Sequence, residues 1–485
     1  MTYYEKHRPR IHYTPKKNWM NDPNGLVYFK GEYHLFYQYN PEANHHDNMH
    51  WGHAVSTDLY HWEERSVKLY PDELGTIFSG SVVVDDKNTS GLFNTDEGGL
   101  VAVFTHDGAS QQQSIAYSGD RGRTWIKYKG NPVIPNTTII DFRDPKVFWH
   151  KESSQWVMSL ACGSCIRFYG SNNLIEWQFL SDFGSSYPSY EGVWECPDLI
   201  QLEVEDTGET EWVLIISINE GAPNGGSGIF YFTGQFDGKS FHPNESETDA
   251  LKWADTGRDF YAAVSFDNTG TDTYWIGWMN NWQYAGHVPV SPWRSAMSLA
   301  RQLSLVNTGG SYLLRQIPVI NDDNEKNTEQ NMTVTPEQPL SLHTGDAFLF
   351  DIRLKGNKDQ SVWGVDFITN QDEVYRLSII SRENRYTFDR TTGSISFSEQ
   401  FPRVIEGPLN GSGHALTTVV DVSSLELFFQ SGLSVSTNLI FPEGQVRCIN
   451  VWNDSGVLPV ESLSMKPLRT VMAAGVSSDT HDTET

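Results

Sequence analysis

Residues 18–25 read NWMNDPNG, and this stretch is the starting point for interpreting the whole chain. Its one carboxylate, Asp22, stands before Pro23, which fixes its own φ and favours an extended conformation in the residue before it. Asn24 and Gly25 then supply the positive φ angles of a tight turn. We therefore expect Asp22 at the rim of a strand, with its carboxylate held in place. Alone, such a string is more often a simple turn.

Two further acidic motifs change that balance: RDP at residues 143–145 and WECP at residues 194–197. Glycoside hydrolysis needs one ionised carboxylate at the anomeric carbon and one protonated carboxyl that gives its proton to the leaving oxygen. Three acids, Asp22, Asp144 and Glu195, are available for these tasks. Alone, each motif is more often structural: RDP is then a strand-end ion pair, and WECP a partly buried Glu paired with an Arg.

The surroundings of the three acids differ. The amides beside Asp22 favour its ionised form, because they can donate hydrogen bonds to it. The apolar neighbours of Glu195 in WECP favour a protonated carboxyl, as a general acid requires. Arg143 favours an ionised Asp144, which would accept hydrogen bonds from sugar hydroxyls.

Composition sets the fold class and excludes some partners. The chain has 485 residues, so two domains are expected, and its aromatic content of 13% with 16 Trp favours an all-β protein with sugar-stacking surfaces. The formal net charge of −26 makes nucleic acid and anionic membranes poor partners. The N-terminus has no apolar signal region and no run is long enough to span a membrane. As it stands the chain is predicted to be cytoplasmic, or secreted if a leader has been removed.

The sequence predicts no metal or cofactor site. Cys162 and Cys165 form a single CxxC pair without a second pair, which argues against zinc and against a redox motif. The histidine-rich loop ANHHDNMHW at residues 43–51 is an alternative metal cluster, but such loops are more often solvated.

Short apolar runs between turn residues predict many strands and few helices. A weak repeat, STDLYHW at 56–62, returns as SGD at 118–120 and SNNLIEW at 171–177, and more weakly as GQFDG at 234–238. Its spacing matches four-stranded propeller blades. We expect a β-propeller over residues 1–318, a polar linker at 319–333, a β-sandwich at 334–473 and a disordered tail at 474–485.

The motifs WMNDPNG, FYQYNP, WGHAVSTDLYHW, FSGS, FRDP, WECPD and WRSAMSLAR, in this order, resemble the β-fructosidase family of invertases, levanases and inulinases. The stretch LELFFQSGLSVSTNLIFP at residues 425–442 is similar to that family's sandwich domain. The resemblance implies a five-bladed β-propeller with the active site in its funnel, followed by a C-terminal β-sandwich.

The resemblance also implies roles for individual residues. Asp22 matches the nucleophile, Asp144 the stabiliser of the transition state and Glu195 the general acid/base. The implied substrate-binding positions are Asn21, Gln38, Trp51, Phe78, Ser79, Arg143 and Trp282. One position departs from the family pattern, because His46 stands where a Trp is usual, and this puts the shape of the apolar wall in question.

The function predicted is retaining hydrolysis of terminal β-fructofuranosyl residues in sucrose or in fructans such as levan and inulin. A fructosyltransferase that uses the same carboxylates is the first alternative. A non-catalytic carbohydrate-binding propeller and an arabinan-type furanosidase are less favoured. The sandwich is expected to pack against the propeller, and a homodimer through it is a further hypothesis.

Overall fold

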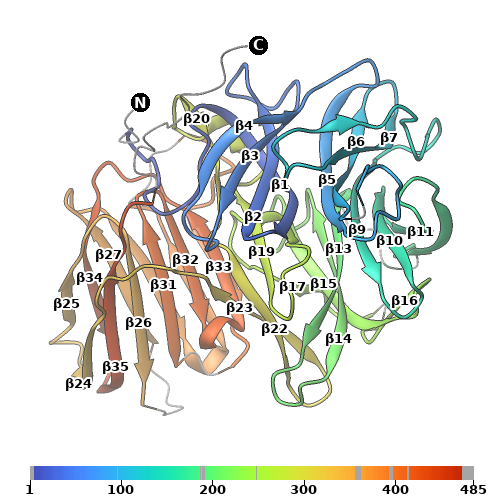
Figure 1. Ribbon diagram of the computed structural model, residues 1–485. Helices are drawn as coiled ribbons and strands as arrows, with labels where there is room; N and C mark the ends of the chain where they lie inside the picture. Colours follow the sequence, from blue (N-terminus) through green and yellow to red (C-terminus); the bar gives the residue numbers. More distant parts are fainter. Residues whose placement is uncertain are drawn as a thin grey trace.

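The computed structural model describes residues 5–95, 97–185, 187, 192–246, 248–355, 362–392, 397–411 and 414–471. These residues form strands and three short 3-10 helices, η1 (Ala285–His287), η2 (Ser381–Glu383) and η3 (Gln430–Gly432), with no α-helix among them. Figure 1 shows an N-terminal body of small sheets beside a C-terminal pair of sheets. The predicted all-β fold class is confirmed.

The N-terminal body contains five sheets. The first contains β20 (Trp293–Arg294), β1 (Asn18–Phe29), β2 (Glu32–Asn40), β3 (His50–Ser56) and β4 (Glu63–Leu69). The second contains β5 (Thr76–Asp85), β6 (Gly99–Asp107), β7 (Gln111–Ser118) and β8 (Ile126–Lys127). The third contains β9 (Phe142–His150), β10 (Gln155–Cys162), β11 (Ile166–Ser171) and β12 (Gln178–Phe183). The fourth contains β13 (Trp194–Glu203), β14 (Thr210–Ile218), β15 (Gly228–Phe236), β16 (Phe241–Pro243) and β17 (Lys252–Trp253). The fifth contains β18 (Tyr261–Ser265), β19 (Thr273–Met279), β21 (Ala296–Met297), β22 (Arg301–Asn307) and β23 (Tyr312–Pro318).

The first long strand of each sheet lies innermost. β1 contacts β5, β5 contacts β9, β9 contacts β13, β13 contacts β18, and β18 contacts β1. These five strands therefore form a closed ring, as propeller blades do around a central axis. The ring brings residues that are far apart in the sequence to the same end of one channel.

Each inner strand is interrupted near its start. The pairing register shifts between Met20 and Pro23, Ile77 and Gly80, Arg143 and Lys146, Glu195 and Asp198, and Tyr261 and Val264. Proline explains three of the shifts, because it has no N–H to donate to a neighbouring strand. Bulges of this kind bend a strand and redirect its side chains, and they recur beside active sites.

The sequence repeat marks the end of the third strand in four sheets. In each copy a side-chain oxygen accepts hydrogen bonds from backbone N–H groups a few residues further on. The acceptors are Asp58, Asp120, Asn173 and Asp237. The repeat is thus a side-chain-capped turn that reverses the chain before the outer strand.

The C-terminal body is a sandwich of two six-stranded sheets. One contains β24 (Asn327–Val334), β35 (Leu458–Pro467), β26 (Phe348–Leu354), β31 (Ala415–Asp421), β32 (Ser424–Phe429) and β33 (Ser434–Leu439). The other contains β25 (Leu340–His343), β34 (Val446–Asn453), β27 (Val362–Thr369), β28 (Val374–Ile380), β29 (Arg385–Asp389) and β30 (Val404–Pro408).

Part of the predicted linker is wrong. Residues 327–333 were expected to be irregular, but they lie in β24 and pair with β35. β24 is an edge strand whose Met332 and Val334 pack against the sandwich core, while Glu329 and Gln330 face solvent. A half-exposed edge strand resembles a linker in composition. The predicted tail at 474–485 lies outside the described residues.

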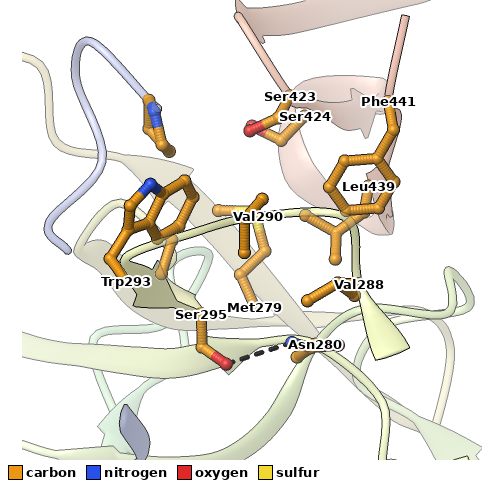
Figure 2. Close-up of a pocket in the computed structure, with 12 residues that line it drawn as sticks. Met279, Asn280, Val288, Val290, Trp293, Ser295, Ser423, Ser424, Leu439 and Phe441 are labelled. Carbon is orange, nitrogen blue, oxygen red and sulfur yellow. Dashed lines mark hydrogen bonds between the residues drawn. The ribbon is translucent and has the colours of Figure 1, made fainter. Parts of the chain in front are cut away.

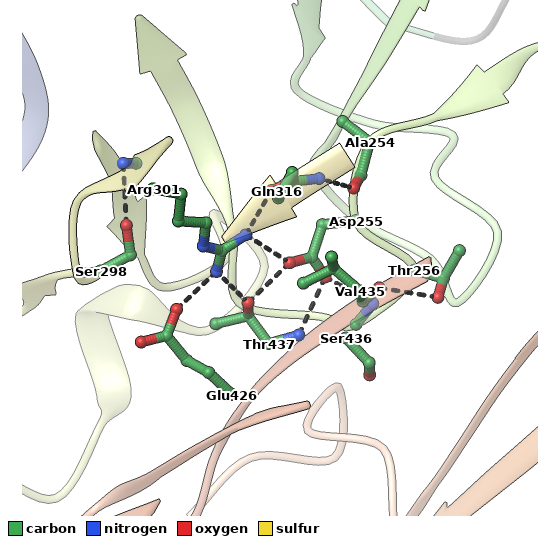
Figure 3. Close-up of polar contacts among 12 residues, drawn as sticks. Ala254, Asp255, Thr256, Ser298, Arg301, Gln316, Glu426, Val435, Ser436 and Thr437 are labelled. Atoms are coloured by element: carbon green, nitrogen blue, oxygen red, sulfur yellow. Dashed lines mark hydrogen bonds and ion pairs between the residues drawn. The ribbon is translucent and has the colours of Figure 1, made fainter. Parts of the chain in front are cut away.

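A buried polar network joins the two bodies, and Figure 3 shows its centre. Arg301 of β22 lies within 3.2 Å of Asp255 and 2.5 Å of the sandwich residue Glu426. His12 contacts the same Glu426 at 2.7 Å and Asp421 at 2.8 Å. Burial lowers the pKa of His12, but the two carboxylates outweigh it and raise the pKa to about 9. Each of these buried charges is therefore paired, and Arg301 and His12 find carboxylate partners across the interface.

Apolar packing completes the interface, as Figure 2 shows. Val288, Val290 and Trp293 of the propeller face Leu439 and Phe441 of the sandwich. The cavity between them is only about 10 Å³, which is the scale of a single water molecule. This interface is thus a packed core and not a ligand site.

Candidate active site

The predicted carboxylates meet at one end of the ring. Asp22, Asp144 and Glu195 come from β1, β9 and β13, and each lies at or inside the bulge of its strand. The thiol of Cys196 connects two of them, because its Sγ lies 3.6 Å from an oxygen of Asp22 and 3.6 Å from an oxygen of Asp144, and the charge of Glu195 acts on both. Residues separated by up to 174 positions are thereby in contact.

Asp22 is held by neighbours that donate hydrogen bonds. Asn21 Nδ2 donates to Oδ1 at 3.1 Å, and Ser79 Oγ donates to Oδ2 at 3.1 Å. Burial and the charge of Glu195 nevertheless raise the pKa of Asp22 to about 6, and the hydrogen bonds only partly oppose this. The expectation that amides alone would determine the ionisation of Asp22 was therefore incomplete. The carboxylate is ionised at pH 7 but poorly solvated, which suits a nucleophile.

Asp144 has an unusual backbone. Its φ is 65°, and Cys196 in β13 has a similarly positive φ of 47°. Both values lie in the left-handed region, where residues other than glycine are strained, and such strain collects at functional sites. The conformation lets Cys196 N donate to Asp144 Oδ2 at 3.0 Å.

The expected partnership of Arg143 with Asp144 needs correction. Burial raises the pKa of Asp144, and the charge of Arg143 lowers it by less. The Arg143 guanidinium donates instead to Glu195 Oε1, from Nε at 3.2 Å and from Nη2 at 2.9 Å. Its Nη1 donates to Asp141 at 2.6 Å. Arg143 therefore orients Glu195 directly and affects Asp144 only through its charge.

Glu195 faces a polar environment, not the apolar one expected from WECP. The Tyr261 hydroxyl donates to Glu195 Oε2, while Arg143 occupies Oε1. A tyrosine hydroxyl can also accept a hydrogen bond, so the pair accommodates either protonation state of the carboxyl. Trp194 packs into the core between the third and fourth sheets, and the Cys196 thiol faces Asp22 and Asp144 instead of Glu195.

An aromatic wall flanks the carboxylates. Trp282 stacks on Trp19 with ring centroids 6.1 Å apart and lies 4.8 Å from Trp278. His46, at the position of the usual Trp, joins this wall 5.4 Å from Trp282 and 6.0 Å from Phe78. Burial lowers the pKa of His46, so the ring is neutral at pH 7. The substitution keeps a flat ring but adds hydrogen-bonding nitrogens.

Two predicted substrate-binding residues lie behind the site surface. Trp51 is 0% exposed and donates from Nε1 to the carbonyl of Phe78 at 3.0 Å. The prediction that Trp51 contacts substrate is not supported, because its ring packs between sheets and supports Phe78 from below. Gln38 is also buried, and its Nε2 donates to Asn24 Oδ1 at 2.8 Å.

The histidine-rich loop does not gather metal ligands. His50 Nδ1 contacts the carbonyl of Asn48, and His46 belongs to the aromatic wall. Across the described ranges, no group of three or more His, Cys, Asp or Glu side chains is arranged to hold a metal ion. The four cysteines are free thiols.

The sequence analysis missed two residues of the site. Tyr261 was not recognised, although β18 is the fifth inner strand and the other four each contribute a predicted residue. Cys196 was noted only as part of WECP. Its thiol touches two of the three acids, and burial raises its pKa well above the usual value. The sequence repeat has no copy in the fifth sheet, so no local signal marked Tyr261.

Family comparison agrees with this geometry. Residues 12–318 match the family model for the glycosyl hydrolases family 32 N-terminal domain, and residues 319–467 match the model for the C-terminal domain of the same family. The chain belongs to glycosyl hydrolases family 32. It is therefore a glycoside hydrolase, and the predicted family resemblance is confirmed.

Individual relatives support the assignment. A levanase of Bacillus subtilis is 45% identical over 97% of this chain and 71% of its own length. The crystal structure of an exo-inulinase from Aspergillus awamori superposes with a TM-score of 0.89 at 36% identity, covering 97% of this chain and all of the other. A β-fructofuranosidase of Schwanniomyces occidentalis, complexed with fructosyl-erythritol, gives a TM-score of 0.88 at 33% identity over 97% and 99% of the two chains. In the described part of the chain, no helix is long and apolar enough to cross a membrane.

Proposed function

We propose that this family 32 hydrolase is a retaining β-fructofuranosidase that removes terminal fructosyl residues from sucrose and fructans. The observation that carries the proposal is that Asp22 and Asp144 meet at the buried Cys196 thiol while the charge of Glu195 acts on both of them. The names of the relatives, levanase, exo-inulinase and β-fructofuranosidase, give the substrate class.

In the first step, Asp22 attacks C2 of the terminal fructofuranoside while Glu195 donates a proton to the departing glycosidic oxygen. The C2–O bond to the leaving sugar breaks, and a fructosyl ester forms on Asp22. Burial leaves the Asp22 carboxylate poorly solvated, so little hydration is lost when it attacks. Arg143 and Tyr261 hold the Glu195 carboxyl from both sides during the proton transfer.

In the second step, Glu195 accepts a proton from water, which attacks C2 and releases fructose. Asp144 accepts hydrogen bonds from ring hydroxyls, and these strengthen as positive charge develops on the sugar ring. The partly exposed Trp282, stacked on the buried Trp19, gives an apolar face for the furanose. No cofactor takes part in these steps.

Product analysis tests the reaction. A time course on sucrose, inulin and levan should give fructose as the main product, whereas oligosaccharides from concentrated sucrose would indicate a fructosyltransferase. Methanol added as an acceptor should yield methyl β-fructofuranoside, since two displacements retain configuration. The α product would refute the double-displacement mechanism.

The assembly state is a separate part of the proposal. A homodimer through the β-sandwich is consistent with exposed apolar side chains there, such as Val404 and Val457, which are 50% and 63% exposed. Light scattering coupled to gel filtration should then give twice the chain mass, and V404D with V457D should restore the monomer. A monomeric native protein would exclude the dimer.

A further inference from the structure

A second cavity lies at the opposite end of the propeller ring from the carboxylates. It has a volume of about 450 Å³ and is lined by the far ends of β5 and β9 and by the turn after β18. Trp149 lies five residues after Asp144 in β9, and a strand rises about 3.3 Å per residue, so the two are about 17 Å apart. The cavity is therefore distinct from the active site, and its size is within the usual range for ligand pockets.

A rigid aromatic surface forms one side of this cavity. Trp149 is 38% exposed and lines the cavity. Its ring centroid lies 5.1 Å from that of Trp156, at 73°. Trp156 is buried and donates from Nε1 to Thr89 Oγ1 at 2.9 Å. The exposed ring is thus supported from behind and needs little reorganisation to bind a ligand.

Polar groups surround the ring. Lys87 Nζ lies 6.0 Å from the Trp149 ring centroid. Asp267 donates its backbone N–H to Leu26 and accepts from Val84 N at 3.4 Å, while Asn268 Nδ2 donates to Tyr28 O at 2.8 Å. These bonds hold the turn after β18 in place beside the cavity. Donors and acceptors therefore surround a flat ring, with the Asp267–Asn268 turn held in place and the Asp86 and Lys87 side chains exposed.

The cavity carries charges of both signs, so charge alone does not select its ligand. Lys87 opposes binding of a cation, and Asp86 with Asp267 opposes binding of an anion. A sugar chain meets the remaining requirements, because its C–H face stacks on an aromatic ring and its hydroxyls both donate and accept hydrogen bonds. We propose that this cavity is a second carbohydrate-binding site that holds a fructan chain away from the catalytic centre. The choice of fructan rests on the proposed function.

Affinity electrophoresis in native gels that contain levan or inulin tests the site. The active-site variant Asp22→Asn serves as the background, so that the polymer is not consumed. This background should be retarded, and adding Trp149→Ala should weaken the apparent affinity about tenfold. Phe179→Ala, which removes an aromatic side chain that is 55% exposed elsewhere on the third sheet, is the matched control and should change nothing.

Activity assays separate this proposal from the proposed function. With Asp22 intact, Trp149→Ala should keep the kcat/KM of the parent enzyme on sucrose while raising its KM on levan or inulin. If the wild-type enzyme hydrolyses fructan but Trp149→Ala leaves polymer affinity unchanged, the second site is refuted and the function stands. A wild-type enzyme without fructan hydrolysis refutes the function, whatever the gels show. If Trp149→Ala does not fold, the double variant Lys87→Ala, Asn268→Ala is tested in its place. Retardation of this double variant by the polymer gel that equals that of the background then overturns the proposed second site.

Discussion

Replacing Asp22 by Asn should remove activity and at the same time stabilise the fold. The change keeps the size of the side chain. The carbonyl oxygen of the new Asn can still accept the hydrogen bond from Asn21, and its NH₂ group can donate one to the Ser79 hydroxyl, which accepts as well as donates. The nucleophile is lost, so kcat on sucrose should fall about 10⁴-fold or more.

The size of the stabilisation follows from the pKa of Asp22. Burial and the charge of Glu195 raise this pKa from 3.8 to about 6. Each pKa unit corresponds to 1.36 kcal/mol, so the buried charge costs about 3 kcal/mol of folding free energy at pH 7. Asn carries no charge, and about 3 kcal/mol is therefore the upper bound of the gain in the free energy of unfolding.

The sign of the pH dependence is fixed by the same shift. Because the folded pKa lies above the unfolded one, the folded protein binds the proton more tightly, and the contribution of Asp22 to stability is lost as the pH rises from about 4 through 6. Protonated Asp22 and Asn are both neutral. The advantage of Asp22→Asn should hence be largest above pH 6 and disappear near pH 4.

Urea unfolding followed by tryptophan fluorescence measures this difference between pH 4 and 7.5. Asp206→Asn is the control, since it makes the same charge change at an exposed turn residue. We expect Asp22→Asn alone to raise the unfolding midpoint at pH 7. A variant that is less stable than wild type at pH 7, or a gain that does not vary with pH, would refute the electrostatic argument.

Three further results are expected. The kcat/KM on sucrose should fall as the pH drops from about 7 through 6, because Asp144, with a pKa raised to about 7, and Asp22, with a pKa raised to about 6, both gain a proton; an acidic limb near pH 4 would contradict both raised pKa values. Trp282→Ala should raise the KM for sucrose about tenfold, because it removes a side chain of the aromatic wall. Trp51→Phe, a change at a buried position, should lower the free energy of unfolding by about 1–3 kcal/mol and leave the KM within about twofold. Equal effects of the two changes on KM would count against the placement of Trp51. His12→Gln should lower the free energy of unfolding by about 3 kcal/mol at pH 7. The urea midpoints of the variant and the wild type should converge as the pH rises through about 9, where His12 loses its charge. A difference between the two midpoints that does not change with pH would exclude a charged His12.

The sequence allowed the general positions of the acids to be predicted because local chemistry decided them. Asp22-Pro23 and Asp144-Pro145 interrupt strands wherever they occur, since proline cannot complete the pairing. The turn that ends each third strand is equally local, because one side chain such as Asp58 caps it. Features that depend on a few neighbouring residues could therefore be read from the chain alone.

Contacts between distant strands could not be predicted. Arg143 adjoins Asp144 in sequence, yet the bulge in β9 directs its guanidinium to Glu195, 52 positions away. Trp51 stands in a sequence motif of the family but packs between sheets, because the orientation of a strand decides which face its side chains cover. Tyr261 comes from an inner strand without an acidic signal, so only the closed ring reveals its contact with Glu195.

The central claim is that a fructosyl group becomes bonded to Asp22. A fructosyl donor with a fluoride leaving group needs no proton from Glu195, so Glu195→Ala should form the ester but hydrolyse it slowly. Rapid quenching, digestion and mass spectrometry should then find one fructosyl residue on the peptide that contains Asp22. Turnover of this donor without any such adduct, or an adduct on a different residue, would contradict the mechanism.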